Sequence, residues 1–346
     1  MRKKLFNKFL CFLSYILVFV FFIFITLLST VYLFCKGPSK KAQKLFVTTF
    51  LETGQMKFMP SLFLSREEIK KIVTDNSLKH MDAEINTSLI NIDSKNNKEL
   101  VEIHDVFGDN YEGKMLVLND PSKISLATTY PFTEYGKTLD KIVKENHALA
   151  GANGGLYVSA SNNGGMPLGV AVSNGEILKV DAYISGLYLI GFDEDNILRI
   201  ISLEKLSESE IRNVIIKERI RDAVGFRDNT SDKNNHFVKL IINGEKRKLN
   251  GLGSGANPRT AIGQREDGTV LILVTDGRGK NGHLGATASD LIEVMEEYGA
   301  FNAANLDGGS SSSLYYNGQF LMTSVTFYYS NSSWRLPTAF IIKRGE

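Results

Sequence analysis

The chain has 346 residues, of which 43% are apolar and 23% charged, an ordinary globular composition with room for one large domain and smaller additions. The first 36 residues hold five of the 40 basic side chains and no acidic one, which leaves 35 basic against 38 acidic side chains in the remainder. That remainder has a net charge of −3 and no basic surplus, so we exclude a nucleic-acid-binding protein.

An uncharged, apolar run of 27 residues, from Phe9 to Cys35, lies near the N-terminus. A bilayer core of about 30 Å requires roughly 20 apolar residues in a helix, so this run is long enough to cross it. A secretory segment has a shorter apolar stretch and a small-residue cleavage site, and the run has neither feature. We therefore expect an uncleaved signal anchor at residues 9–35, preceded by a cytoplasmic N-terminus.

The orientation of this anchor is predicted from the domain that follows it. Basic residues flank it on both sides, so the positive-inside rule barely discriminates. The flanking residues are Arg2, Lys3, Lys4 and Lys8 before the span and Lys36, Lys40, Lys41 and Lys44 after it. Because an N-terminal anchor ordinarily exports the following domain, we predict a single-pass protein of the cell membrane with an extracellular main domain. Both cysteines, Cys11 and Cys35, lie in the span, which excludes a disulfide-stapled external domain.

A stalk and linker are expected between the anchor and the main domain. Ser39–Glu52 and Ser65–Val73 have helical patterns, and Ser65 with Glu68 forms a capping box. Asn86–Asn97 is polar and Asn-rich, as linkers are. We therefore divide the chain into residues 1–36 (N-terminus and anchor), 37–97 (stalk and linker) and 98–346 (main domain).

From about residue 100 the pattern changes to short β-like runs separated by turns. The predicted strands are Val101–Val106, Lys114–Leu118, Ser125–Thr129, Val170–Ser173, Glu176–Val180, Leu187–Ile190, Leu198–Leu203 and Phe237–Ile242. The pairs Asn174-Gly175, Asn243-Gly244 and Asn317-Gly318 predict tight hairpin turns, since both central residues of a type I′ turn need positive φ. Helices are predicted at Thr138–Asn146, Ser207–Arg219 and Thr287–Tyr298. The last is expected to begin with a cap formed by Thr287 and Asp290 and to stop at Gly299.

The last of these helices joins two strands that end in the same kind of turn. Val270–Thr275 runs into Asp276-Gly277-Arg278, and Phe301–Leu306 runs into Asp307-Gly308-Gly309. A strand, a helix and a strand in this order predict a βαβ unit with parallel strands and a right-handed crossover. Both Asp-Gly turns then leave the sheet at the same edge, where small molecules bind in α/β architectures.

Two arginines and a hydroxyl-rich loop accompany these carboxylates. Arg259 and Arg278 offer planar, bidentate donors that match a phosphate or a carboxylate. The segment Gly308-Gly309-Ser310-Ser311 offers N–H groups and hydroxyls that suit a phosphoryl group or a sugar. Asp276 and Asp307 fit the roles of nucleophile, general base or ligand to a divalent cation. Because a phosphodiester is already a good leaving group, arginines and one carboxylate near the anomeric carbon suffice to break its bond to a sugar.

Each of these features alone has an ordinary structural explanation. An Asp-Gly pair after a strand is most often a turn, Arg259 could form an ion pair with Asp307, and the serine run 310–313 could be a surface loop. His283 is expected in a surface loop too, since no histidine pair has zinc-ligand spacing. Four such features around one βαβ unit nevertheless favour a site.

These segments resemble the phosphodiester glycosidase family. The resemblance covers about residues 100–346 and rests on blocks that follow the order of the family. The blocks are Gly151-Ala152-Asn153-Gly154-Gly155, Asn257-Pro258-Arg259-Thr260, Asp276-Gly277-Arg278, Asn305-Leu306-Asp307-Gly308-Gly309 and Arg335-Leu336-Pro337-Thr338-Ala339. The chain departs from the family at Leu156-Tyr157, where an aromatic pair or Asp-Phe is frequent, and at Ser310, where a third glycine is common.

The resemblance implies a mixed α+β domain with a large, curved, mixed sheet and flanking helices. It implies a hydrolase that cleaves a sugar-1-phosphodiester at the anomeric C–O bond. Asp307 is then the carboxylate at the anomeric centre, Asp276 supports it or binds a divalent cation, and Arg259 and Arg278 hold the phosphate. The implied substrate-binding residues are Asn153, Gly154, Thr260, Asn305, Gly308, Gly309, Ser310 and Ser311. Bacterial members are associated with exopolysaccharides, so the expected substrate is a phosphodiester-linked glycan of the cell envelope, such as one carrying N-acetylglucosamine or resembling teichoic acid.

Two other functions fit the same residues. A non-catalytic protein that binds or assembles exopolysaccharide would also need arginine and hydroxyl donors. A metal-dependent phosphodiesterase would break the P–O bond in place of the C–O bond. No cofactor is predicted with certainty, and a divalent cation at Asp276 stays an open alternative.

Overall fold

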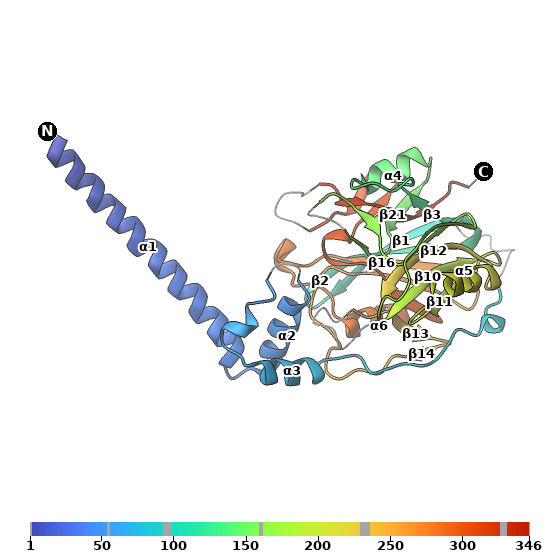
Figure 1. Ribbon diagram of the computed structural model, residues 1–346, viewed down its shortest axis with the longest axis horizontal. Helices are drawn as coiled ribbons and strands as arrows, with labels where there is room; N and C mark the ends of the chain where they lie inside the picture. The colour runs from blue at the N-terminus through green and yellow to red at the C-terminus, as the bar shows by residue number, and fades with distance from the viewer. Residues whose placement is uncertain are drawn as a thin grey trace. The chain divides into compact units, whose positions relative to one another are not determined.

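The computed structural model describes residues 2–53, 56–92, 99–158, 162–228, 236–325 and 331–345 (Figure 1). The chain forms two compact units, Met1–Asp75 and Asn76–Glu346. Residues 93–98, which include part of the expected linker, lie outside the described residues.

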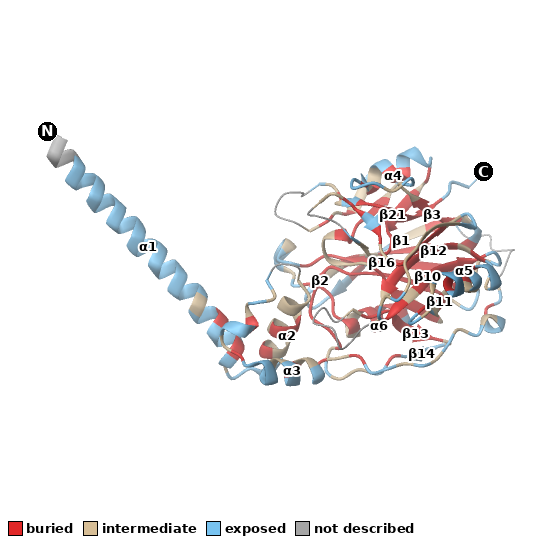
Figure 2. Cartoon of the chain, in the orientation of Figure 1, coloured by how far each residue is buried: buried red, intermediate tan, exposed pale blue. Residues whose placement is uncertain are grey.

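The first unit is helical. Its elements are α1 (Arg2–Lys36), α2 (Lys40–Leu51), the 3₁₀ turn η1 (Pro60–Leu62) and α3 (Arg66–Thr74). The segment Phe6–Lys36 of α1 is long and apolar enough to cross a membrane, and most of its residues are exposed (Figure 2). The predicted capping box is confirmed, since Ser65 Oγ accepts the Glu68 N–H and the Glu68 carboxylate accepts the Ser65 N–H.

The second unit begins at Asn76, ahead of the residue 98 that we expected. Leu78 forms a β-bridge with Leu249, and Asn76 Nδ2 donates to Ser254 O at 3.0 Å. The first residues of this unit are therefore packed against the β-rich domain and are part of it.

Three sheets, two short strand pairs and three α-helices make up the described part of the second unit. The seven-stranded sheet has the order β1 (Val101–Gly108), β2 (Tyr111–Leu118), β16 (Val270–Thr275), β15 (Thr260–Gln264), β17 (Asn302–Asn305), β13 (Lys239–Ile242) and β14 (Glu245–Lys246). The second sheet has the order β11 (Leu198–Ser202), β10 (Leu187–Asp193), β12 (Ile220–Arg227), β8 (Val170–Ser173) and β9 (Glu176–Val180). The third has the order β19 (Gln319–Met322), β18 (Leu314–Tyr316), β5 (Ala150–Asn153), β21 (Thr338–Ile342) and β3 (Ile124–Thr128).

The remaining elements lie on or between these sheets. The strand pairs are β20 (Arg335–Leu336) with β4 (Lys137–Thr138) and β6 (Tyr157–Val158) with β7 (Met166–Pro167). The α-helices are α4 (Leu139–Glu145), α5 (Glu208–Lys217) and α6 (Ala288–Glu297). The 3₁₀ turns are η2 (Thr87–Leu89), η3 (Pro121–Lys123), η4 (Lys280–Gly282) and η5 (Gly309–Ser311). The mixed α+β class is thus confirmed, but the single large sheet that we expected is divided into three, and every strand pairing among the described residues is antiparallel.

The middle of the seven-stranded sheet is buried on both faces, and this explains why the sequence of β16 is almost continuously apolar. Val270, Ile272 and Val274 pack into a central core shared with the other two sheets. Leu271 and Leu273 point to the opposite face and pack into a second core with α6. Successive side chains of a strand alternate between faces, so a strand buried on both sides has no polar position.

The predicted βαβ unit is present with one strand inserted. β16 and β17 are both antiparallel to β15, which lies between them, so they run in the same direction as predicted. α6 connects them and carries the predicted cap: Thr287 and Asp290 form a capping box, and Gly299 follows the helix with φ of 76°. The three predicted hairpin turns are also confirmed, since both residues of Asn174-Gly175, Asn243-Gly244 and Asn317-Gly318 have positive φ.

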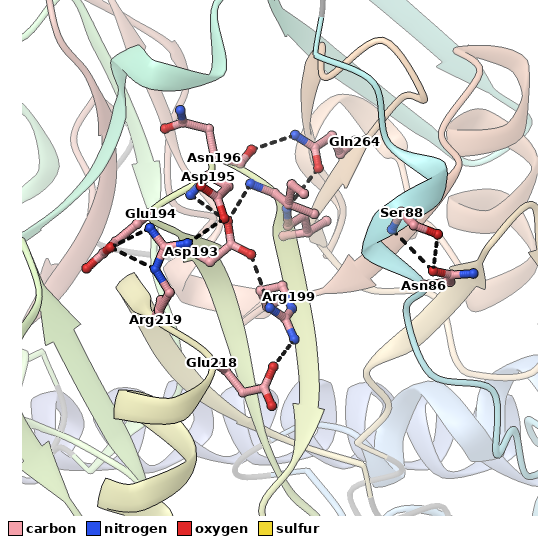
Figure 3. Close-up of polar contacts among 12 residues, drawn as sticks. Asn86, Ser88, Asp193, Glu194, Asp195, Asn196, Arg199, Glu218, Arg219 and Gln264 are labelled. Atoms are coloured by element: carbon pink, nitrogen blue, oxygen red, sulfur yellow. Dashed lines mark hydrogen bonds and ion pairs between the residues drawn. The ribbon is translucent and has the colours of Figure 1, made fainter.

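A saturated polar network joins two sheets at the far end of β15, at Gln264. Gln264 Oε1 accepts the Leu198 N–H at 2.8 Å, and its Nε2 donates to Asn196 O at 2.9 Å (Figure 3). Asp193 Oδ1 accepts the Ile197 N–H at 2.9 Å, and Asp193 Oδ2 accepts from Arg199 Nη1 at 3.1 Å. Because these groups satisfy one another, we assign the network a structural role.

Candidate functional site

Four strand ends meet at one edge of the second unit. β16 ends at Thr275 and β17 at Asn305, while antiparallel β15 begins between them at Thr260. β5 of the third sheet ends at Asn153, whose Nδ2 donates to Asp307 O at 2.6 Å. The turns that carry the predicted catalytic residues therefore leave the sheets at a shared edge.

Asp307 is half-buried in the turn after β17. Its carboxylate accepts hydrogen bonds from the Ser311 hydroxyl and the Gly308 N–H, and it interacts electrostatically with Arg278. Burial raises the pKa of the Asp307 carboxyl to about 6, and these three interactions oppose that rise. A carboxyl with a pKa near neutrality, beside a cation and hydroxyls, is suited to act on a reacting centre.

Arg278 lies close to this carboxylate on the turn after β16. Its Nη1 donates to Ser310 Oγ at 2.8 Å. Desolvation and the charge of Arg259 lower the pKa of the Arg278 guanidinium, whereas Asp307 raises it. Arg278 as a whole is exposed, but its guanidinium lies against Gly309. Any other residue at position 309 would place its Cβ 2.5 Å from Arg278 Nη2. Gly309 also has φ of 63°, so both the backbone and this close approach favour glycine.

Arg259 is buried, with 9% of the residue exposed. Its Nη2 donates to Gly255 O at 2.8 Å and to Ser254 Oγ at 3.1 Å, and its Nε donates to Ala286 O at 3.3 Å. The guanidinium stacks over Phe237, with Cζ 5.1 Å from the ring centroid. Arg259 is therefore fixed in place, and its charge reaches the site, as its effect on Arg278 shows.

Asp276 is buried, with 2% exposed, and both of its carboxylate oxygens have partners. Oδ1 accepts the Glu112 N–H at 2.8 Å, and Oδ2 lies 2.9 Å from His283 Nδ1. Among the described residues, no hydrogen bond joins Asp276 to Asp307. His283 lies in a loop whose neighbouring residues Gly282 and Leu284 are exposed, as expected, and its ring pairs with Asp276. The hydrogen bond to Asp276 raises the pKa of His283 above its usual range, against a smaller opposing effect of desolvation.

Glu112, Asp276 and His283 form a group with the chemistry of a cation site. Each places one ligand atom within 4.8 Å of the others. Two carboxylates and an imidazole suit a transition-metal ion such as Zn²⁺ or Mn²⁺. A divalent cation held by Asp276 would find its further protein ligands here.

Three of the predicted substrate-binding side chains are buried supports of the site. Asn153 and Thr260 are fully buried, and Asn305 is 2% exposed. Thr260 Oγ1 donates to Asn153 Oδ1 at 2.8 Å, which orients the amide that holds the Asp307 backbone. Asn305 Nδ2 donates to Phe237 O at 3.0 Å, which ties β17 to the segment before β13. In this arrangement the three side chains position the loop that carries Asp307, and they are too deeply buried to be exposed to a ligand.

Of the glycines and serines predicted to bind substrate, Gly154 follows β5, and the others form the loop after β17. A Cβ at Gly154 would come within 2.5 Å of Thr338 Oγ1, and one at Gly308 within 2.9 Å of Pro258 O, so both sit in close backbone contacts. Ser310 and Ser311 reach Arg278 and Asp307 as described above.

Tyr157 is a site residue that our interpretation of the sequence missed. Its hydroxyl lies 3.2 Å from Ser311 Oγ, and burial together with the charge of Asp307 raises its pKa. The sequence signal was the departure of Leu156-Tyr157 from the frequent family pattern. Glu112 was missed as well, because it stands on a hairpin 164 residues from its partner Asp276 and has no motif around it.

The family of the chain follows from comparison with known proteins. A family model for phosphodiester glycosidases matches residues 146–343, more than half of the chain. Among curated proteins, the SPbeta prophage-derived protein YomE of Bacillus subtilis is 43% identical over 65 residues, which cover 19% of this chain and 10% of that protein.

One solved structure with a TM-score above 0.5 shows a shared fold. The chain is similar to the catalytic domain of zebrafish N-acetylglucosamine-1-phosphodiester alpha-N-acetylglucosaminidase, auto-inhibited by its pro-peptide, with a TM-score of 0.55 and 20% identity over 79% of this chain and 92% of that one. A protein from Synechocystis matches with a TM-score of 0.43 and 16% identity over 70% of this chain and 62% of that one. From the extent of the family match, the chain belongs to the phosphodiester glycosidase family, a family of hydrolases.

Proposed function

We propose that this protein hydrolyses a sugar-1-phosphodiester by breaking the bond between the anomeric carbon and its oxygen. Water supplies the hydroxyl that ends on the sugar, and the electron pair of the broken bond leaves with the phosphate oxygen. The products are a free sugar and a phosphate monoester. The observation that carries this proposal is the half-buried Asp307 carboxyl, with its raised pKa, in electrostatic contact with Arg278.

Asp307 is the group that acts at the anomeric centre in this proposal. At pH 7 a carboxyl with a pKa of about 6 is mostly ionised and is a stronger base than an ordinary aspartate. It can stabilise the positive charge that develops on the sugar, attack the anomeric carbon or deprotonate water. Ser311 and Gly308 fix its orientation.

The arginines hold the phosphate and stabilise the leaving group. Arg278 presents its guanidinium at the loop, and Arg259 adds a second positive charge from a fixed, buried position. Two like charges close to one another create a local positive potential, which favours an anion. Asp276 contributes by fixing the turn that carries Arg278, or as ligand to a cation with Glu112 and His283.

The proposed substrate is a phosphodiester-linked glycan of the cell envelope, such as a teichoic-acid-like polymer with N-acetylglucosamine. The apolar helix Phe6–Lys36 supports an anchor that keeps the enzyme at the membrane, with the catalytic domain on the outer side. For this arrangement we propose the expected division into a stalk (residues 37–97) and a catalytic domain (residues 98–346), with the difference that residues 76–92 belong to the compact unit of the domain.

The test is hydrolysis by the full-length protein in detergent micelles, with UDP-N-acetylglucosamine as a simple sugar-1-phosphodiester. We expect N-acetylglucosamine and UDP as products. Binding of this compound without turnover would favour the alternative of a glycan-binding or assembly protein. N-acetylglucosamine 1-phosphate as the product would favour a phosphodiesterase.

We predict an acidic limb in the pH dependence of this reaction. Because Asp307 acts in its ionised form, kcat/KM should rise between pH 5 and pH 7 with a midpoint near the Asp307 pKa of about 6. His283 also titrates above its usual range, so the profile is measured in parallel on a His283→Gln variant. Loss of the limb in that variant, or a flat profile in the wild type, would contradict the role of Asp307.

A further inference from the structure

Exposed aromatic side chains gather on the segment that follows β3. Tyr130 and Tyr135 are each 55% exposed, and Phe132 between them is partly exposed. Val158 and Met166 on the β6–β7 pair are also exposed. Large exposed apolar groups that cluster on a soluble domain commonly mark a binding surface.

The segment is held in a defined conformation by its own polar groups. The Tyr135 N–H donates to Thr133 Oγ1 at 3.2 Å, and that hydroxyl donates to Tyr135 O at 3.0 Å. The Gly136 N–H donates to Asn163 O at 2.7 Å, and Asn163 Nδ2 donates to Glu134 Oε1 at 2.7 Å. A preorganised surface loses little conformational entropy when a ligand binds to it.

The rings themselves have fixed neighbours. Tyr130 and Phe132 meet edge to face, with centroids 5.5 Å apart. The Arg335 guanidinium lies over Tyr135, with Cζ 5.5 Å from the ring centroid. The surface therefore combines flat aromatic faces with one cation.

Two connections place this surface beside the active site. β3 ends at Thr128, which pairs with Thr338, and the next residue of β21, Ala339, pairs with Asn153. Asn153 in turn holds the Asp307 backbone. β3 and β21 lie side by side (Figure 1), so the aromatic segment leaves the third sheet at the edge that carries the site.

The second connection runs through the β6–β7 pair. Tyr135 forms a β-bridge with Gly164, so the aromatic segment lies alongside the residues that lead into β7. On β6, Tyr157 reaches Ser311 beside Asp307. On the same strand, the exposed Val158 pairs with the exposed Met166 of β7, two residues after the Gly164 that pairs with Tyr135.

We propose that Tyr130, Phe132 and Tyr135 form a platform that binds a further sugar unit of a phosphodiester-linked glycan, beyond the bond that is hydrolysed. The C–H face of a pyranose ring is apolar and packs on an aromatic ring, while the tyrosine hydroxyls bind sugar hydroxyls. Arg335 would pair with an anionic group of the same chain. This inference rests on the proposed function and makes the preferred substrate a polymer.

The platform is tested by removing two rings together in the full-length protein. The double variant Tyr130→Ala/Tyr135→Ala is compared with wild type in calorimetric titration with a purified N-acetylglucosamine-bearing teichoic acid and in hydrolysis of UDP-N-acetylglucosamine. We expect polymer affinity to fall about tenfold or more, as loss of two stacking contacts implies, while kcat/KM for the short substrate stays within about twofold. Both tyrosines are exposed, so the thermal midpoint should be retained.

Ile216→Ala is the matched control, because Ile216 is an exposed apolar side chain at the other end of the domain. Ile216 is 68% exposed and lies on α5, next to the start of β12. The opposite end of β12 lies on the side of the site, because Gly225 there accepts a hydrogen bond from the Leu156 N–H. This variant should change neither measurement.

Unchanged polymer affinity in the double variant, an equal loss for both substrates, or no polymer binding by an active wild type would each overturn the platform. A wild type that binds polymer through these tyrosines but hydrolyses no phosphodiester would overturn the proposed function and keep the platform.

Discussion

Replacement of Asp307 by asparagine is expected to lower kcat for UDP-N-acetylglucosamine by about 10³–10⁴-fold, the usual effect of removing an acid–base or nucleophilic group. Asparagine keeps the shape of the side chain and can still accept hydrogen bonds from Ser311 and Gly308, so the affinity for the substrate should change by less than about threefold. Single-turnover kinetics and calorimetric titration measure the two quantities separately.

The same variant, Asp307→Asn, is expected to be more stable than the wild type near neutral pH although it is less active. The folded-state pKa of Asp307 is raised, so its contribution to stability is fully present below the ordinary pKa near 3.8 and is lost as pH rises through about 6. Asp307→Asn should therefore raise the thermal midpoint at pH 7.5 and have a smaller effect at pH 4. Retained turnover, or a destabilised variant at pH 7.5, would contradict the environment that we describe for this carboxyl.

Replacement of either arginine by methionine should lower the activity by a similar factor, but only the Arg259 variant should be less stable than the wild type. Arg278→Met is expected to lower kcat/KM by about 10²–10³-fold, since a donor to the developing negative charge is lost, with little change in unfolding free energy. Arg259→Met should lower activity similarly and also reduce the unfolding free energy by about 2–4 kcal/mol, because Ser254, Gly255 and Ala286 lose their buried donor.

Arg212→Met is the control for these variants. Arg212 forms an exposed ion pair with Glu208 on α5, so its loss should alter activity and stability little. Denaturant titration measures the stability of the three variants, and steady-state kinetics measures their activity. Full activity in Arg278→Met, or wild-type stability in Arg259→Met, would contradict the roles assigned to these side chains.

Local signals in the sequence predicted the local structure. The Ser65 and Thr287 caps and the Asn-Gly hairpins depend on residues within four positions of one another, and the structure has each of them. The common edge of the turns at Asp276 and Asp307 was also predictable, because one helix connects the two strands.

Long-range pairing was not predictable from these signals. The insertion of β15 between β16 and β17 depends on which strand completes the sheet, and no short motif encodes that choice. The buried strand β12 was missed because its Arg221 and Asp222 interrupt the apolar pattern, although they pair with each other in the structure. The partners Glu112 and Tyr157 likewise reach the site through the fold alone.

Burial explains the remaining difference between the predicted and observed site. Asn153, Thr260 and Asn305 have side chains typical of sugar-binding residues, and a sequence pattern does not distinguish an amide that binds substrate from one that holds a loop. In the structure Thr260 orients Asn153, and Asn153 holds Asp307. These residues shape the site through the backbone of the catalytic turn.

The position of the broken bond tests the central claim most directly. The full-length protein is incubated with UDP-N-acetylglucosamine in ¹⁸O-water, and the products are identified by mass spectrometry. Cleavage at the anomeric carbon predicts the label in N-acetylglucosamine and none in UDP. Label in a phosphate product would show that the P–O bond is broken and would contradict the assignment of Asp307 to the anomeric centre.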